Sequence, residues 1–448
     1  MKTWQDVASL YQIYPRSFRD TNGDGVGDLN GITEKLDYLA WLGVDAIWIS
    51  PFFTSPLTDF GYDIADYREI DPTFGDLEDF RTLLEKAHVL DIKVMIDLVP
   101  CHTSDQHPWF QEARSSRDNP KRDYYVWRDG RDGIEPNNWR SLSGGSSWEL
   151  DEQTGQFYLH SFLKTQPDLN WDNPAVRDEM KNVVRFWFDM GVDGMRVDAI
   201  WGISKDPEFG DDSPNPDFHG DPEAYGAFIH DHCKMGPRFQ EYLHELASIC
   251  DEYDDKQMVF EFYPDEKLGD IYQQYHKVLT AHPKASAFFM EYRQDEWHAE
   301  HVGQKIENYL RATGSARPFF CVGNHDQPRV ASRLGTERAR ALHFLNLLTP
   351  GVSVMYYGDE IGMTNGELTT EDIQDNFSPA NSVIDSRDLE RTPMQWDDTR
   401  FAGFSEVKPW LPVNKNRTFV NVNSEKSSPA SMLNLHRALL RLRQEFPI

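Results

Sequence analysis

The chain has 448 residues and a formal net charge of −29, from 74 acidic and 45 basic residues. This excess of negative charge argues against nucleic acid or an anionic membrane surface as a partner. Hydrophobic residues make up 39% of the chain, enough for a large core, and no apolar run reaches the roughly 18 residues of a membrane span. We expect a soluble globular protein, cytoplasmic by default because no apolar leader follows Met1.

From the N-terminus, short apolar runs alternate with longer segments of helical spacing. The predicted strands span residues 10–18, 46–50, 92–99, 195–200, 258–263, 286–292, 318–323 and 352–357. The predicted helices span residues 31–42, 77–90, 173–190, 238–253, 268–276, 296–312, 337–348 and 430–444. This alternation favours an α/β fold, a (β/α)8 TIM barrel. A doubly wound open sheet is the alternative, but no glycine-rich phosphate loop follows the first strand.

One segment, residues 101–170, breaks the alternation. It is rich in Trp, Tyr, Asn and Gly, and its aromatic content is too high for a disordered linker. We therefore expect a small subdomain inserted after the third strand. The predicted organisation is a first barrel part at 1–100, the inserted subdomain at 101–170 and the rest of the barrel at 171–448.

Ionisable residues stand at the carboxyl ends of the predicted strands, where the chemistry of barrel enzymes is located. Arg196 and Asp198 share one face of their strand, so Arg196 is expected to keep Asp198 ionised and its pKa low. A structural buried ion pair is the alternative for these two residues. Glu261 lies between Phe260 and Phe262, an apolar setting that favours the neutral carboxyl.

An ionised carboxylate next to a neutral carboxyl suits the cleavage of a glycosidic bond, which needs a nucleophile and a general acid. Asp198 would be the nucleophile and Glu261 the acid. Asp326 follows the seventh strand and is expected to hold sugar hydroxyls, with His102 and His325 as further donors.

Short motifs of one enzyme family run through nearly the whole chain. They are QIYPRSF (12–18), GYDI (61–64), DLVP (97–100), QPDLN (166–170), GMRVD (194–198), FE (260–261), NHD (324–326) and RTPMQW (391–396). With these motifs the chain resembles the α-amylase superfamily of glycoside hydrolases, family 13, and within it the oligo-1,6-glucosidase and α-glucosidase subgroup.

The resemblance implies a retaining double displacement, with Asp198 as nucleophile, Glu261 as acid/base and Asp326 as transition-state stabiliser. The residues that it implies for holding the terminal glucose are Asp63, His102, Phe162, Gln166, Arg196, His325 and Arg387. Arg391, in the same loop as Arg387, is a second candidate of lower rank.

The expected function is an exo-acting α-glucosidase that releases glucose from maltose-like or sucrose-like ends of small oligosaccharides. The residue after Asp198 is Ala199; in the subgroup a Val there accompanies α-1,6 preference, and a smaller residue or Thr accompanies α-1,4 tolerance. The alternatives are an oligo-1,6-glucosidase, a transglucosylating relative and, more remotely, a non-catalytic relative such as a transporter subunit. Whether the protein is a monomer or a dimer stays open.

The loop DTNGDGVGD, residues 20–28, places oxygen ligands at every second position around glycines, as calcium loops do. It lacks the twelfth-position Glu of an EF-hand, and a metal-free turn is the alternative. The family similarly binds a structural Ca²⁺ or Mg²⁺ here, through the side chains of Asp20, Asn22, Asp24 and Asp28 and the carbonyl of Val26. No organic cofactor is predicted.

The chain departs from the family at two places. Cys101 stands where the family has Asn, so the calcium that amylases hold at that position is not expected. The chain also ends directly after the eighth predicted helix, whereas relatives carry a C-terminal β-domain, so we expect that domain to be absent. The four cysteines form no CxxC pair and predict neither a disulfide framework nor a zinc site.

Overall fold

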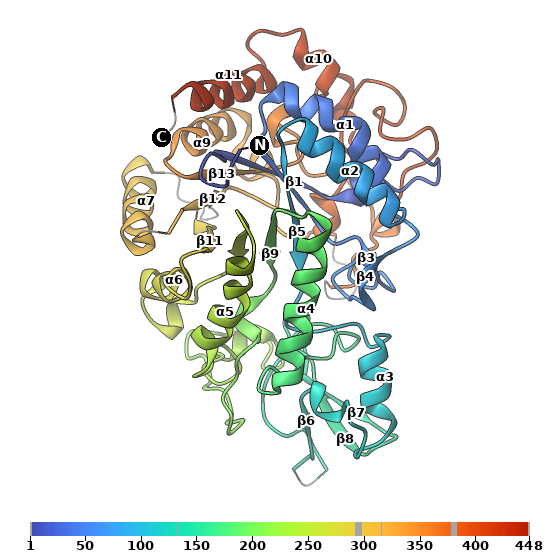
Figure 1. The fold of residues 1–448 in the computed structure, drawn as a ribbon, viewed down its shortest axis with the longest axis vertical. Coiled ribbons are helices and arrows are strands. Elements are labelled where there is room, and N and C mark those ends of the chain that lie inside the picture. The colour runs from blue at the N-terminus through green and yellow to red at the C-terminus, as the bar shows by residue number, and fades with distance from the viewer. Residues whose placement is uncertain (1, 132, 292–297, 315, 378–382, 447–448) are drawn as a thin grey trace.

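A computed structural model of the chain describes all residues except 1, 132, 292–297, 315, 378–382 and 447–448. Among the described residues, eight parallel strands close into a barrel (Figure 1), in the order β1, β2, β5, β9, β10, β11, β12, β13. Their bounds are β1 Ser9–Ile13, β2 Ala46–Ile49, β5 Lys93–Leu98, β9 Gly194–Val197, β10 Gln257–Phe260, β11 Ala285–Phe289, β12 Phe319–Cys321 and β13 Val352–Tyr356. The predicted TIM barrel is confirmed.

Helices surround the barrel on its outer side (Figure 1). They are α1 Leu29–Leu42, α2 Leu77–Val89, α4 Pro174–Met190, α5 Phe239–Ala247, α6 Ile271–Leu279, α7 Ala299–Thr313, α8 Val330–Leu334, α9 Thr336–Leu348 and α11 Met432–Glu445. The ends of α1 follow from its sequence: the Asp28 side chain accepts from the Gly31 N–H, and Gly43 ends the helix at φ 102°.

Apolar side chains cover both faces of the barrel wall, as continuous apolar strands require. Trp48, Met95 and Phe288 belong to a buried cluster inside the barrel. Ile47 and Ile96, one position away along the same strands, belong to the larger cluster between strands and helices. This alternation fixes which side chains point into the barrel, and therefore which ones reach the site at its rim.

Between β5 and α4 the chain forms a separate group of elements, in the lower part of Figure 1. It contains α3 (Pro108–Ser115) and an antiparallel sheet of β6 (Trp127–Arg128), β8 (Gln156–Leu159) and β7 (Trp148–Asp151). Trp139 and Trp148 of this segment pack with Cys233 and Phe209, which come from the long loop after β9. The division at residues 100 and 170 stays a prediction.

Some predicted boundaries differ from the structure. The strand predicted over 10–18 ends at Ile13, because Pro15 begins a 3-10 turn over Pro15–Ser17. The helix predicted over 238–253 divides into α5 and a 3-10 helix, Ser248–Glu252. The predicted strand end at 292 and helix start at 296 lie outside the described residues.

Several short elements were not predicted at all. They are β7, the hairpin of β3 (Phe53–Thr54) and β4 (Asp66–Ile70), the helices α3 and α8, and α10 (Val422–Lys426) in the loop after β13. Each is two to eight residues long. Segments this short show too little hydrophobic periodicity to be read from one sequence.

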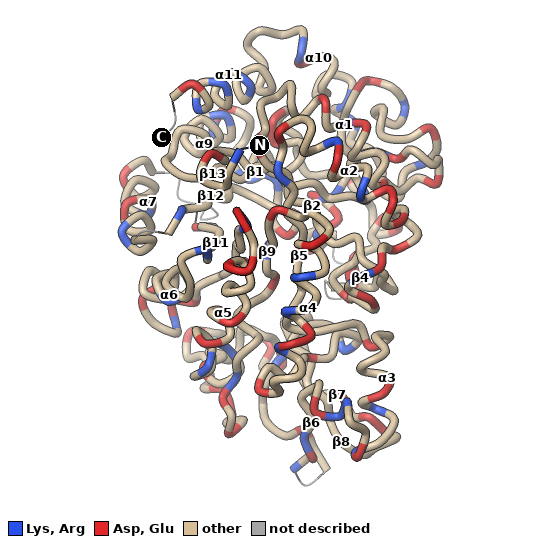
Figure 2. The backbone as a smooth tube through the Cα atoms, in the orientation of Figure 1, with Lys and Arg blue, Asp and Glu red and all other residues tan. Residues whose placement is uncertain are grey.

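Acidic positions are spread over helices and loops throughout the view of Figure 2. The negative charge of the chain is therefore not confined to one element. None of the helices that the structure describes is long and apolar enough to cross a membrane.

Candidate active site

A cavity of about 430 Å³ lies at the carboxyl ends of the barrel strands. This volume is typical of small-molecule sites. The predicted residues that line it are His102, Phe162, Asp198, Glu261, His325, Asp326 and Arg387. They come from segments far apart in the sequence, and closure of the barrel brings them together.

Arg196, fully buried in β9, holds three carboxyl groups at the base of this cavity. Its Nη1 donates to Asp198 Oδ1 at 2.7 Å and to Asp97 Oδ1 at 2.5 Å, and its Nη2 pairs with Glu261 Oε1. The N–H of Ala199 donates to the second oxygen of Glu261 at 3.2 Å. The two carboxyl groups predicted to form the catalytic pair are therefore fixed on one guanidinium.

The protonation of Asp198 differs from the expectation drawn from the sequence. Burial raises the pKa of Asp198 well above its ordinary value; Arg196 opposes this shift, while Glu261 and Asp97 add to it. Burial also raises the pKa of Asp97 to about 6. The expected low pKa of Asp198 was wrong because one guanidinium is shared by three acidic groups in a site shielded from water.

Asp326, which follows β12, lies against three basic side chains. His325 Nε2 is 3.2 Å from Asp326 Oδ2, while Arg391 Nη2 and Arg387 Nη1 are 2.8 Å and 3.4 Å from Oδ1. Burial would raise the pKa of Asp326, but His325, Arg391 and Arg387 together hold it far below its usual range. Asp326 therefore presents a stable negative charge to the cavity.

Arg387 lies in the wall of the cavity and forms two short ion pairs there. Its Nη2 lies 2.7 Å from Asp59 Oδ1 and 2.7 Å from Asp375 Oδ1. Asp59 belongs to the segment after β2 and Arg387 to the loop after β13, and both line the cavity. The ion pair thus joins two loops from different parts of the barrel across the pocket.

Asp63, a predicted glucose-binding residue, lies outside the cavity lining. Its Oδ1 accepts from Ser55 Oγ at 2.8 Å and from the Asp59 N–H at 3.0 Å, and its Oδ2 accepts from the Thr58 N–H at 2.8 Å. Asp63 therefore shapes the turn that presents Asp59. The structure places Asp59, four positions earlier, in the cavity lining, and the chain between the two aspartates turns through Phe60 and Gly61 at φ 49° and 109°.

Gln166 also lies behind the cavity wall rather than in it. Its Nε2 donates to Asp59 Oδ2 at 3.0 Å and lies 3.1 Å from His102 Nε2. The His102 ring lies 4.9 Å from the ring of Phe162. Gln166 is therefore placed to orient Asp59 and His102, while His102 and Phe162 face the cavity.

Much of the cavity wall is aromatic, and this wall was not predicted. The additional aromatic residues that line the cavity are Tyr62, Trp201, Tyr225, Tyr263 and Phe377. Tyr62 is stacked on His325, with ring centroids 5.3 Å apart and planes at 5°. Lys234 joins this wall from the loop after β9. These residues lie in irregular loops, where spacing carries no signal about which side chains face a site.

The predicted cation loop, residues 20–28, has the backbone that such a loop needs. Gly25 stands at its sixth position with φ 90°, as the sharp turn of a calcium loop requires. Asp20 accepts from the N–H groups of Gly23 and Gly25 at 2.7 and 2.9 Å. Because the candidate donors are all oxygen atoms, the loop fits a hard cation such as Ca²⁺ or Mg²⁺.

Comparisons with known proteins agree with this geometry. The model of the α-amylase catalytic domain matches residues 12–448. An oligo-1,6-glucosidase of Parageobacillus thermoglucosidasius is 40% identical over all of this chain, which covers 84% of that protein. An α-glucosidase of Apis mellifera is 39% identical over 97% of this chain, which covers 78% of it.

Solved structures of similar chains share the fold. An α-glucosyl transfer enzyme matches with a TM-score of 0.93 and 40% identity, over 100% of this chain and 85% of that one. The trehalulose synthase from Pseudomonas mesoacidophila MX-45 matches with a TM-score of 0.87 and 40% identity, over 99% and 84%. Together with the barrel and its acidic rim, these matches show that the chain belongs to the α-amylase family of glycoside hydrolases.

Proposed function

We propose that this protein is a retaining, exo-acting α-glucosidase that removes terminal glucose from disaccharides and short oligosaccharides. The observation that carries the proposal is the placement of Asp198 and Glu261 on the two ends of the Arg196 guanidinium, in a pocket whose wall includes the Asp59–Arg387 ion pair. Family membership and relatives named oligo-1,6-glucosidase and α-glucosidase support it.

In the first step a carboxylate oxygen of Asp198 attacks the anomeric carbon, and Glu261 gives its proton to the departing glycosidic oxygen. In the second step water attacks the same carbon, Glu261 takes a proton from that water, and Asp198 leaves as the carboxylate. Each step inverts the configuration at the anomeric carbon, so the product retains the configuration of the substrate. The first step requires Asp198 as the carboxylate and Glu261 as the neutral acid, and Arg196 contacts both side chains.

Asp326 supplies the third charge of this mechanism. Its stable carboxylate faces the positive charge that develops on the sugar ring in the oxocarbenium-like transition state. We propose that His102, His325 and Arg387 hold the glucose hydroxyls beside it, with Asp59 in the place expected for Asp63.

We propose that the Asp59–Arg387 ion pair, which lies in the cavity wall, blocks extension of a sugar chain beyond the terminal glucose and so gives exo action. A tetrasaccharide of α-1,4-linked glucose with a label at its reducing end tests this. We expect the first products to be free glucose and the labelled trisaccharide. Labelled glucose or labelled disaccharide as the first product would show internal cleavage and contradict the proposal.

Ala199 bears on the linkage preference. It lines the cavity and has left-handed backbone angles, φ 44° and ψ 42°, which β-branched residues avoid. We propose a preference for maltose or sucrose over isomaltose. Ala199→Val should lower the unfolding free energy by about 1–3 kcal/mol through backbone strain and raise the isomaltose-to-maltose rate ratio.

Ala199→Thr is the matched control for this variant, because Thr has the same branched shape. It should lose similar stability and keep the preference for maltose. If both variants change the ratio equally, the side-chain shape rather than the chemistry at this position sets the linkage. If the unchanged protein releases glucose fastest from isomaltose, the oligo-1,6-glucosidase alternative is the correct one.

We also propose that loop 20–28 binds a structural Ca²⁺ or Mg²⁺ through Asp20, Asn22, Asp24, Asp28 and the Val26 carbonyl. The ligand positions match the first, third, fifth, seventh and ninth positions of an EF-hand loop. A chelator should lower the unfolding temperature, and added Ca²⁺ or Mg²⁺ should restore it. Asp24→Ala should remove the part of this response that Ca²⁺ or Mg²⁺ restores; an unchanged unfolding temperature in the chelator would contradict the proposal.

A further inference from the structure

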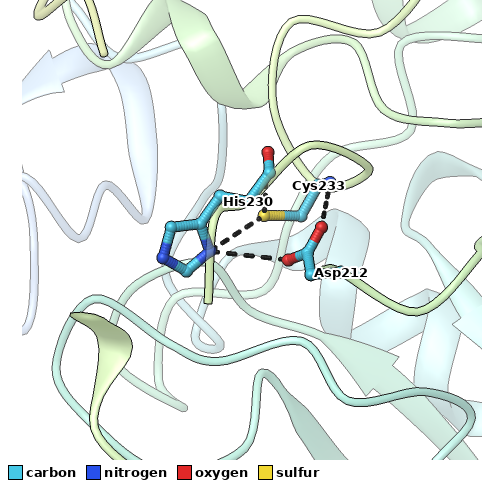
Figure 3. Close-up of side chains that lie close together, drawn as sticks. All are labelled: Asp212, His230 and Cys233. Atoms are coloured by element: carbon cyan, nitrogen blue, oxygen red, sulfur yellow. Dashed lines mark hydrogen bonds and ion pairs between the residues drawn. The ribbon is translucent and has the colours of Figure 1, made fainter. Parts of the chain in front are cut away.

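A second group of reactive side chains lies in the long loop between β9 and α5, apart from the catalytic carboxylates. Asp212, His230 and Cys233 are buried there with 1%, 3% and 8% exposure, and Figure 3 shows them pointing toward one another. His230 Nδ1 lies 3.5 Å from Cys233 Sγ and 3.4 Å from Asp212 Oδ2. Among the described residues, this is the group whose metal-ligating atoms all lie within 4.8 Å of one another.

These distances are those of ligands around one zinc ion. Zinc–sulfur bonds of about 2.3 Å and zinc–nitrogen and zinc–oxygen bonds of about 2.0 Å, at tetrahedral angles, give a sulfur–nitrogen distance of about 3.5 Å and a nitrogen–oxygen distance of about 3.3 Å. The observed 3.5 and 3.4 Å agree with both values. The third pair, the Cys233 sulfur and a carboxylate oxygen of Asp212, lies within 4.8 Å, so these two side chains would move closer together when the ion binds.

The surroundings orient the ligands for this role. His230 Nε2 donates to the Tyr225 carbonyl at 2.9 Å, which leaves the lone pair of Nδ1 directed at the cluster. The Tyr225 ring is stacked on the His230 ring at 3.8 Å. Asp212 Oδ1 accepts from the N–H groups of His232 and Cys233, whereas its buried Oδ2 accepts no hydrogen bond from any described residue.

We propose that Asp212 Oδ2, His230 Nδ1 and Cys233 Sγ bind a Zn²⁺ ion, with the fourth position taken by water. Thiolate and imidazole ligands favour a transition metal over Ca²⁺ or Mg²⁺, which separates this site from loop 20–28. A Cys–His–Asp catalytic relay does not fit, because Cys233 and Asp212 face the same ring nitrogen of His230. In a relay, the acid and the nucleophile contact opposite nitrogens.

The site is placed to stabilise the wall of the catalytic pocket. Tyr225, which holds His230, and Lys234, which follows Cys233, both line the cavity. Cys233 also packs against Trp139 and Trp148 of the segment between β5 and α4. Zinc binding would displace the thiol proton of Cys233 to solvent. It would also hold together the cavity wall at Tyr225 and Lys234, the buried cluster, and the segment between β5 and α4.

Cobalt(II) is the probe that tests the site in the full chain. After treatment with a strong chelator, Co²⁺ is added, and the absorption spectrum is recorded before and after addition of Zn²⁺. We expect one equivalent of Co²⁺ to give a thiolate-to-cobalt charge-transfer band and visible bands of tetrahedral intensity, both lost when Zn²⁺ displaces it. Oxygen ligands in loop 20–28 give no thiolate band, so the two sites are distinguished.

Variants assign the band to its ligands. Cys233→Ser and His230→Gln should abolish it, whereas Cys250→Ser, which alters another buried cysteine outside the cluster, should keep it. Absence of the thiolate band in the folded, unchanged protein would overturn the proposal. A band that persists in Cys233→Ser, or disappears in Cys250→Ser, would also overturn it. The thiolate band of the unchanged protein is measured without any variant, so the proposal can still be tested if a variant fails to fold.

Discussion

Asp193 and Asp198 lie five positions apart at opposite ends of β9, and their surroundings have opposite effects on them. Asp193, at the amino end, accepts from His88 Nε2 at 2.9 Å, from the Val94 N–H at 2.8 Å and from Lys93 Nζ at 3.3 Å. Burial would raise the pKa of Asp193, but these three donors hold it below its ordinary value. Burial raises the pKa of Asp198 well above its ordinary value instead.

The difference lies in the balance of charges. At the amino end, Lys93 serves Asp193 and Asp255, and His88 adds a second donor to Asp193. At the carboxyl end, Arg196 is the one cation, among the described residues, that forms ion pairs with Asp97, Asp198 and Glu261. The amino end is thus arranged for stability, whereas the carboxyl end keeps an excess of acid that is costly for folding and useful for chemistry.

The largest effect should come from the nucleophile. Asp198→Asn should lower kcat by at least about 10⁴-fold, because no carboxylate then attacks the sugar. The unfolding temperature should stay the same or rise, since one of three competing acidic groups is removed. Asp193→Asn is the matched control: it should keep kcat and lower the unfolding temperature. Equal loss of activity in both variants would contradict the contrast between the two ends.

The next effect is on stability at the amino end. Lys93 is 5% exposed, and Lys93→Met would leave Asp193 and Asp255 without their shared cation. We expect a loss of about 3 kcal/mol in unfolding free energy, typical of breaking a buried ion pair from one side. Activity at a temperature where the variant is folded should not change. Urea unfolding and initial rates measure the two quantities separately, and a fall in kcat would show that this end serves catalysis.

The smallest effect is a pH dependence of opposite sign at the two ends. Asp97 has a pKa raised to about 6 in the folded protein. Between about pH 4 and 6 the folded state therefore binds more protons than the unfolded state, and the contribution of Asp97 to stability falls as the pH rises. As the pH rises over this range, the unfolding temperature of Asp97→Asn should fall less steeply than that of the unchanged protein. Asp193 has a lowered pKa and contributes stability that is lost as the pH falls below about 4. In Asp193→Asn, the unfolding temperature should therefore fall less steeply as the pH is lowered through this range.

The barrel could be predicted because its strands are buried on both faces. Runs such as Ile47–Trp48 and Met95–Ile96 are apolar at every position. The helices that alternate with the strands have recognisable capping residues, such as Asp28 at the start and Gly43 at the end of α1. Carboxyl groups within or directly after such runs were recognisable for the same reason. Asp198 and Glu261 could therefore be singled out from the sequence, and both line the cavity, while the pKa of Asp198 depended on how many acidic groups share Arg196.

The loops could not be predicted in the same way. Asp59 and Asp63 are equivalent candidates in the sequence, and the irregular turn between them, with positive φ at Phe60 and Gly61, leaves Asp59 in the cavity lining and Asp63 outside it. Asp212 and Cys233 are 21 positions apart in a segment without periodicity, so cysteine spacing gave no sign of a cluster with His230. Side chains placed by irregular backbone need three-dimensional coordinates.

The identity of the nucleophile is tested most directly by trapping the glucosyl-enzyme. A 5-fluoro-α-glucosyl fluoride forms the covalent intermediate and slows its hydrolysis, and peptide mapping by mass spectrometry then locates the sugar. We expect one fluoroglucosyl group on Asp198, and none when Asp198 is replaced by Asn. Inactivation with the sugar on Asp97, Glu261 or Asp326 would contradict it.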